Sequence, residues 1–132
     1  MSNIRNIQVK LMKGLLDLIV LQLLRSKPMH GYQIITSIRR TFGVYFGPST
    51  IYPLLNDLEK SGYVTSEWDM SRERPRKVYR LTHEGRSLLN FAEESLSIIC
   101  RKIGVAENLR MNHKEDERCS ATFLNIVREK SS

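Results

Sequence analysis

Cations are concentrated in one short stretch of the chain. Arg72, Arg74, Arg76 and Lys77 surround a single acid, Glu73, so four cations stand against one anion and this stretch has a net charge of +3. Closely spaced guanidinium groups suit contacts with phosphates and insertion into the minor groove of DNA. The alternative is a solvated turn, which is the usual explanation for a charge run. We favour the DNA contact, for a reason that depends on the predicted fold described below.

A second set of polar side chains follows helical spacing just upstream. Apolar residues at positions 51, 54, 55 and 58 define one face of a predicted helix over 48–61. The residues facing away from it that we take as candidate DNA contacts are Ser49, Thr50, Tyr52, Asn56 and Lys60. Hydroxyl groups bind phosphates or bases, a threonine methyl packs on a thymine methyl, asparagine reads adenine, and lysine binds backbone phosphate. The alternative is a solvated helix face, which the acids Asp57 and Glu59 favour.

The residues that carry catalysis and metal binding do not form a recognisable pattern in this sequence. His30, His83 and His113 are far apart and have no Cys, Asp or Glu at metal-ligand spacing. Cys100 and Cys119 are isolated, and we interpret both as reduced thiols. The sequence has no phosphate-binding glycine loop, nucleophile elbow or paired-carboxylate motif. We therefore predict no enzyme activity, no cofactor and no metal, and interpret His30 as a structural residue at a helix start.

The excess of positive charge lies outside the C-terminal tail. The 132 residues carry a formal net charge of +7, and residues 107–132 contain five basic and five acidic residues, so the whole excess lies in residues 1–106. Such a surplus favours polyanionic partners, nucleic acid first and an anionic membrane surface second. No apolar run approaches the roughly 20 residues that span a bilayer, and the N-terminus has no secretory pattern. We expect a cytoplasmic protein without membrane segments.

Periodicity and turn residues predict the elements that position these side chains. The expected order begins with a helix over 4–24, with a break or kink at Gly14, followed by a tight connection over 26–31 and helices over 32–41 and 48–61. Strands over 63–68 and 77–81, joined by the loop 69–76, come next, and a long helix capped by Thr82 then runs to at least Ile103. Ser49 is the expected N-cap of the third helix. Three helices followed by a two-stranded hairpin form a winged helix-turn-helix, a mainly α fold with a small β-hairpin. The basic loop then occupies the wing, where such a fold needs positive charge.

The long C-terminal helix carries an apolar stripe that requires a partner. Leu88, Ala92, Leu96, Ile99 and Ile103 are spaced 4, 4, 3 and 4 residues apart. The available partners are the N-terminal helix, with Ile7 and Leu11, and a second subunit. Burial within the monomer is the alternative, but we favour dimerisation because most helix-turn-helix proteins bind DNA in pairs.

Five blocks of this sequence resemble the PadR family of transcription regulators. The blocks are Gly14–Leu21 (GLLDLIVL), His30–Ile34 (HGYQI), Pro48–Leu55 (PSTIYPLL), Leu58–Val64 (LEKSGYV) and Tyr79–Arg86 (YRLTHEGR). They occur in the family's order, and the resemblance covers about residues 11–100. The chain departs from the short-tailed family pattern after Ile103, and the longer-tailed members have a larger C-terminal helical domain than the remaining residues can build.

The resemblance implies a winged-helix homodimer that usually represses promoters. It implies DNA contacts from the helix that begins Ser49-Thr50 and from the wing, and dimerisation through the long C-terminal helix packed with the N-terminal helix. It also implies a small hydrophobic effector near the dimer interface, where Phe91 and Trp68 either line a pocket or simply pack. The expected organisation is a DNA-binding domain over 1–81, a dimerisation helix over 82–104 and a tail over 105–132.

The leading hypothesis is therefore a homodimeric, sequence-specific regulator that binds double-stranded DNA and acts as a repressor. The first alternative is a non-specific or architectural DNA-binding protein that uses the same basic surface. The second alternative is a winged helix that assembles with an acidic protein, in which case the charge does not serve DNA binding.

Overall fold

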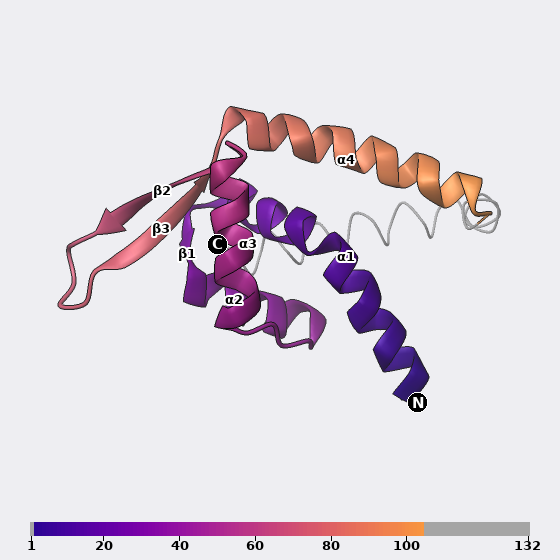
Figure 1. Cartoon of the computed structure of the whole chain (residues 1–132), viewed down its shortest axis with the longest axis horizontal. Helices are drawn as coiled ribbons and strands as arrows, with labels where there is room; N and C mark the ends of the chain where they lie inside the picture. The colour runs from indigo at the N-terminus through magenta and orange to yellow at the C-terminus, as the bar shows by residue number, and fades with distance from the viewer. Residues whose placement is uncertain (1, 105–132) are drawn as a thin grey trace.

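A computed structural model of the chain describes residues 2–104 (Figure 1). The predicted tail over 105–132 lies outside the described residues. The elements, in chain order, are α1 (Ser2–Ser26), β1 (Met29–His30), α2 (Gly31–Phe42), α3 (Pro48–Lys60), β2 (Val64–Asp69), β3 (Arg76–Leu81) and α4 (His83–Lys102). The predicted order of three helices, a hairpin and a long helix is confirmed, and the fold is mainly helical with a small antiparallel sheet.

The first helix, α1, has a buried half and an exposed half. From Met12 onward its apolar residues enter the core, where Val20 and Leu21 are fully buried. Ile4, Ile7 and Leu11, by contrast, are exposed, and Figure 1 shows this end of the helix projecting from the body. The helix runs without interruption through Gly14, so the predicted break at this residue does not occur.

The sheet has three strands, one more than the sequence predicted. Met29 and His30 pair with Tyr79 and Val78, which places β3 between β1 and β2 in an antiparallel sheet. The predicted hairpin is present: β2 is shifted by one residue, β3 begins one residue earlier, and the loop is shortened to residues 70–75. The short strand β1 converts the predicted tight connection into a link between the helix-turn-helix and the wing.

The second helix begins with a reciprocal cap at His30. The Gln33 backbone N–H donates to His30 Nδ1 over 3.3 Å, and the Gln33 side-chain oxygen accepts from the His30 backbone N–H over 3.1 Å. Each contact satisfies a polar group that the first turn of a helix otherwise leaves unpaired. The prediction that His30 is a structural residue at a helix start is confirmed.

The third helix begins at Pro48, two positions before the start that an N-cap at Ser49 implies. Its N-cap is Gly47, which makes no side-chain cap, and Pro48 is the first helical residue. The predicted N-cap at Ser49 is therefore wrong, because Pro48 already has the fixed φ of a helix and no N–H to satisfy. Pro53 is consequently the sixth helical residue rather than the fourth, and the helix lacks one hydrogen bond to the Ser49 carbonyl. At the other end, Gly62 takes a φ of +85° and the chain turns into β2.

The last helix is anchored at its start and exposed along most of its length. The hydroxyl of Thr82 accepts from the Gly85 N–H at 3.0 Å, which confirms the predicted cap. A Cβ built on Gly85 would lie 2.3 Å from the Tyr63 carbonyl oxygen, so the first turn of α4 approaches the backbone where only glycine fits. Leu89 is the buried contact with the core, and Arg25 of α1 pairs with Glu93 at 3.7 Å.

Candidate nucleic-acid interface

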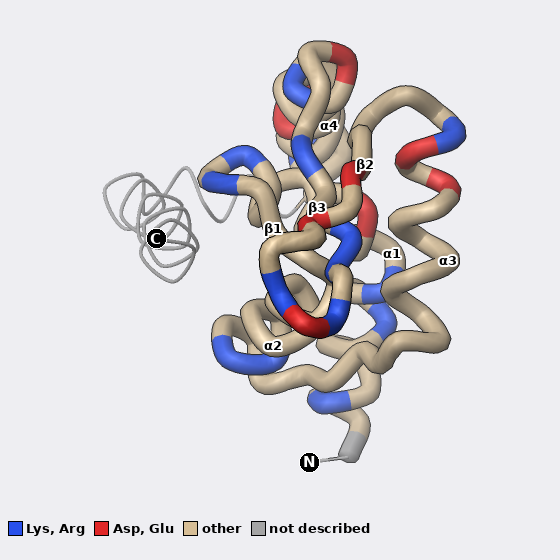
Figure 2. Tube along the Cα trace, turned by 90° about the vertical axis from the view of Figure 1, so that its left-hand side faces the viewer, with Lys and Arg blue, Asp and Glu red and all other residues tan. Residues whose placement is uncertain are grey.

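The wing formed by β2, β3 and their loop projects away from the helical body (Figure 1). Viewed toward this side of the molecule, Lys and Arg positions are frequent on the wing loop and at the end of α2 (Figure 2). The two elements predicted to contact DNA, α3 and the wing, are adjacent in the fold because β2 follows α3 after a short turn and packs against it.

The start of α3 is open to solvent. Pro48, Ser49 and Thr50 are all exposed, and no side chain caps this end of the helix. The positive end of the helix dipole favours an anion here, although Pro48 has no N–H and the Thr50 N–H donates to the Gly47 carbonyl oxygen at 3.0 Å. Ser49 and Thr50 therefore present hydroxyl groups beside an electropositive helix end, as contacts with DNA phosphates require.

The remaining candidates on α3 divide into exposed and packed side chains. Asn56 and Lys60 are exposed. Tyr52 is 40% exposed, but its ring lies against the start of α2, since a Cβ built on Gly31 would be 2.6 Å from it. Tyr52 thus packs α3 onto α2, a role that the sequence did not indicate.

The four wing cations differ in their surroundings. Arg72 and Arg74 are exposed, and neither forms an ion pair with another described residue; we call these two the wing-tip arginines. Arg76 is also exposed, and its Nη1 lies 3.0 Å from His30 Nε2. Lys77 is half-buried, and its Nζ lies 3.7 Å from Glu59 and 5.9 Å from the centre of the Tyr79 ring. Of these four cations, the wing-tip arginines are the two whose side chains have no ion pair, hydrogen bond or ring contact with another described residue.

A turn at the start of the wing loop is held by Asp69. The carboxylate accepts hydrogen bonds from the Ser71 hydroxyl at 2.6 Å and from the Ser71 N–H at 3.0 Å. These bonds, with a smaller contribution from the charges of Arg72 and Arg76, hold the pKa of Asp69 below its ordinary value. The loop that carries the wing-tip arginines therefore begins from a defined local conformation.

His30 presents a hydrogen-bond donor toward the wing. A neutral imidazole has one N–H and one acceptor nitrogen, and Nδ1 is the acceptor for the Gln33 N–H. Nε2 therefore carries the proton and faces Arg76, which also has donors alone. Burial, followed by the charges of Arg76 and Arg72, lowers the pKa of His30 and favours this neutral form.

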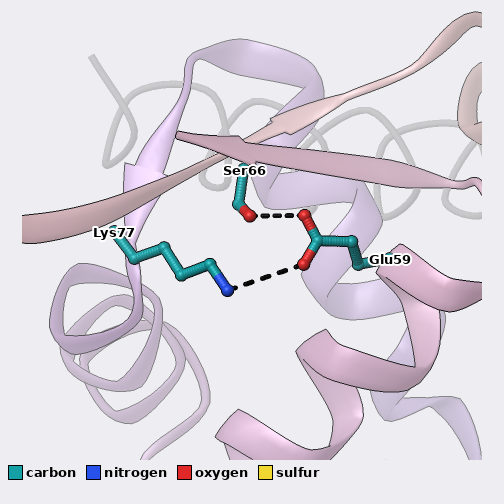
Figure 3. A network of polar contacts seen from close by, with 3 residues as sticks. All are labelled: Glu59, Ser66 and Lys77. Carbon is teal, nitrogen blue, oxygen red and sulfur yellow. Dashed lines mark hydrogen bonds and ion pairs between the residues drawn. The ribbon is translucent and has the colours of Figure 1, made fainter. Parts of the chain in front are cut away.

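A polar network that the sequence did not predict joins α3 to both strands of the wing (Figure 3). The Ser66 hydroxyl donates to Glu59 Oε2, while Glu59 Oε1 pairs with Lys77. Burial, then the Glu59 charge and Tyr52, raise the pKa of Tyr79, which lies beneath Lys77. The sequence indicated Glu59 as evidence for a solvated helix face, and the network contradicts that interpretation.

The residues predicted to form a dimer interface are mostly exposed in the single chain. Leu88 and Ala92 are half-buried, whereas Leu96, Ile99 and Ile103 are 40%, 55% and 69% exposed. Ile7 and Leu11 of α1 are also exposed, as are Phe91 on α4 and Trp68 on the wing. Phe91 and Trp68 thus do not pack into the core of this chain.

The grouping of potential metal ligands and the character of the helices are known for the described residues alone. No group of three or more His, Cys, Asp or Glu residues among them is placed to hold a metal ion. None of the described helices has the length and apolar character needed to cross a membrane.

Comparison with known proteins identifies relatives among transcription regulators. The chain is 33% identical over 75 residues to a transcriptional regulator of Mycobacterium tuberculosis, a match that covers 57% of this chain and 69% of that protein. It is 29% identical over 102 residues to the transcriptional activator GvpE of Haloferax mediterranei, a match that covers 77% of this chain. The chain spans about half of GvpE, 47% of its length.

Solved structures and family comparison agree with these matches. A PadR family transcriptional regulator from Eggerthella lenta DSM 2243 has 32% identity and a TM-score of 0.71, over 80% of this chain and 92% of that one. Residues 20–90 match the Transcriptional regulator PadR-like family, whose members regulate transcription and are not enzymes. The predicted family is thereby confirmed, and this chain belongs to the PadR-like family of transcriptional regulators.

Proposed function

We propose that this protein is a homodimeric repressor that binds a pseudo-palindromic operator. The observation that carries the proposal is the pair of wing-tip arginines on a projecting hairpin, exposed and without an ion pair among the described residues, in a chain of a regulator family. Cations that form no ion pair within the protein are available to bind phosphates. Residues 1–81 would form the DNA-binding unit, and residues 82–104 the dimerisation helix.

Both DNA-facing elements contribute to the proposed interface. Ser49 and Thr50 lie at the open helix end, Asn56 and Lys60 follow along α3, and Arg76 and His30 point donors at the same space. One phosphate oxygen would accept hydrogen bonds from both Arg76 and His30. This would relieve the unfavourable contact between two donor groups. Tyr52 and Lys77 are engaged within the fold, which supports a role for both in orienting the interface.

Dimerisation is proposed from the exposed apolar stripe on α4 and the projecting end of α1. Large exposed apolar patches on a small protein indicate an interaction surface, and a second copy offers the same surface with two-fold symmetry. Two winged helices would then contact half-sites about one helical turn, ~34 Å, apart. A small hydrophobic effector would bind where the two copies meet, because apolar clefts between subunits are common ligand sites.

Repression is proposed because occupancy of a promoter by a DNA-bound dimer is enough to block polymerase. Activation, the role of the Haloferax mediterranei relative, requires a further contact with polymerase. Transcription in vitro from a promoter that the protein binds distinguishes the two: transcript levels should fall on addition of the protein, and a rise would refute repression.

Footprinting on the DNA upstream of its own gene tests the mode of binding. A discrete, symmetric protected site is expected. Uniform protection would favour the architectural alternative, and no retention of DNA at low salt would favour assembly with an acidic protein partner. Footprints repeated with a panel of hydrophobic compounds test the proposed release.

Sedimentation tests the dimer with a matched pair of variants. Ile99→Glu places a charge within the stripe, whereas Ser97→Glu places the same charge on the opposite side of α4. Ile99→Glu should shift the protein toward monomer and weaken operator binding, because an unpaired charge would be buried in the interface. Equal sedimentation of the two variants and the parent would refute this interface.

A further inference from the structure

Glu59 lies near the end of α3, but its carboxylate contacts the wing. One oxygen accepts from Ser66 of β2, and the other lies 3.7 Å from Lys77 of β3. The side chains of Glu59 and Lys77 are each only about one-third exposed, at 32% and 33%. A single carboxylate therefore engages both strands of the hairpin at once, as Figure 3 shows.

The strand register explains why the two partners meet the same carboxylate. Ser66 pairs with Tyr79 and Trp68 pairs with Lys77, so alternate residues of both strands place these side chains on one face of the sheet. This face continues from the buried Val64 toward the exposed Trp68. Glu59 thus contacts the hairpin where it leaves the core, and the wing-tip arginines lie beyond this contact.

A carboxylate at this place is unfavourable for DNA affinity by charge alone. Removing one anion from a protein surface strengthens its attraction to a polyanion. Removing a residue that holds the wing at a fixed angle to α3 should instead weaken specific binding. The reason is that the helix and the wing must reach the same half-site together. The two effects differ in sign, so they can be separated by experiment.

We propose that Glu59 is a positioning residue that sets the angle of the wing relative to α3 and thereby contributes to operator specificity. Lys77 acts as its counterion and does not contact phosphate. This inference rests on the proposed DNA-binding function and extends it, because it assigns specificity to a residue that does not face the DNA. The network needs all three side chains, since a two-point contact limits rotation as well as separation.

The test compares Glu59→Gln with Glu67→Gln. Glu67 is a carboxylate of the wing itself and pairs with Arg80 at 2.9 Å on the other face of the sheet. Both variants remove one negative charge from the protein. Dissociation constants are measured for a duplex selected from random DNA by the unsubstituted protein and for a scrambled duplex, at one salt concentration.

Glu59→Gln should weaken binding to the selected duplex about tenfold, the loss expected for roughly one mismatched base pair. Its binding to the scrambled duplex should be unchanged or tighter. Glu67→Gln should leave unchanged the ratio of the dissociation constant for the scrambled duplex to that for the selected duplex. Equal changes for both duplexes in Glu59→Gln, or the same behaviour in both variants, would overturn the inference.

Ser66→Ala provides a second variant that changes no charge. Like Glu59→Gln, it should lower the ratio of the dissociation constant for the scrambled duplex to that for the selected duplex. An unchanged ratio would also overturn the inference. Thermal unfolding of each variant separates a loss of fold, which lowers binding to both duplexes, from a loss of wing position. If the unsubstituted protein itself selects no duplex, the proposed function fails first, and the inference fails with it.

Discussion

Substitution of both wing-tip arginines by alanine should flatten the salt dependence of DNA binding. Arg72 and Arg74 are exposed and form no ion pair with the other described residues. Binding of these two arginines to phosphates would therefore break no ion pair with another described residue. Each phosphate neutralised by a cation contributes about 0.9 to the slope of log affinity against log salt.

The expected change follows from the number of contacts. Two arginines on each of two wings make four contacts in the proposed dimer, so the slope should become less steep by about 3.6. Between about 50 and 200 mM salt, the unsubstituted protein should then lose roughly 150-fold more affinity than the variant. A monomer on DNA would show half the change in slope, so the same measurement also reports on stoichiometry.

The assay is fluorescence anisotropy with a labelled duplex over a series of salt concentrations. The matched control replaces Arg86 and Arg101 by alanine, which removes the same two charges from the side of α4 opposite its apolar stripe. The control should retain the slope of the unsubstituted protein. If the wing-tip variant retains it too, the wing does not contact phosphate. If both variants flatten it equally, binding follows net charge and not a defined interface.

Two further predictions concern the fold, and both are measured at fixed protein concentration because a dimer's stability depends on it. Gly85→Ala should lower the free energy of unfolding by about 1–3 kcal/mol in urea titrations, because the new methyl group would overlap the Tyr63 carbonyl. Gly14→Ala has open space around the new methyl group, and it should instead raise the free energy of unfolding by up to about 1 kcal/mol. Because the folded protein favours neutral His30, the unfolded chain binds its proton more readily, and stability should be lost as pH falls below about 6.5. His30→Asn, which caps a helix without titrating, should weaken this pH dependence of the thermal unfolding midpoint, and an identical dependence in both proteins would contradict the role of His30.

The sequence predicted most elements because their signals are local. Helical periodicity and the capping threonine of the last helix survive in the fold, since they depend on residues within a few positions of one another. The strand β1 was missed because Met29 and His30 form a strand by pairing with β3, about 50 residues later in the sequence. Ser49 was assigned as an N-cap because two local preferences compete there, and the preference of Pro48 for the first helical position prevails.

The site was predictable where it depends on exposed charge and not where it depends on packing. The wing-tip arginines follow from composition and the expected hairpin. Glu59, by contrast, has partners 7 and 18 residues away in the sequence, Ser66 and Lys77, and only the strand register brings them to one face. Tyr52 was predicted to face outward, but its contact with Gly31 requires the packing of α2 on α3. No periodicity in a single element indicates such contacts.

In the proposed interface, net charge would therefore overstate the number of DNA contacts. Within the wing, Lys77 is paired with Glu59 and Arg80 with Glu67, so these cations attract DNA over a distance but release few counterions at contact. In the proposed interface, the wing-tip arginines would do both. A charge excess of +7 brings the protein to DNA, whereas the salt dependence counts the cations that exchange ions for phosphates. The carboxylates of Glu59 and Glu67 would separate these two quantities, because each one pairs with a cation of the wing.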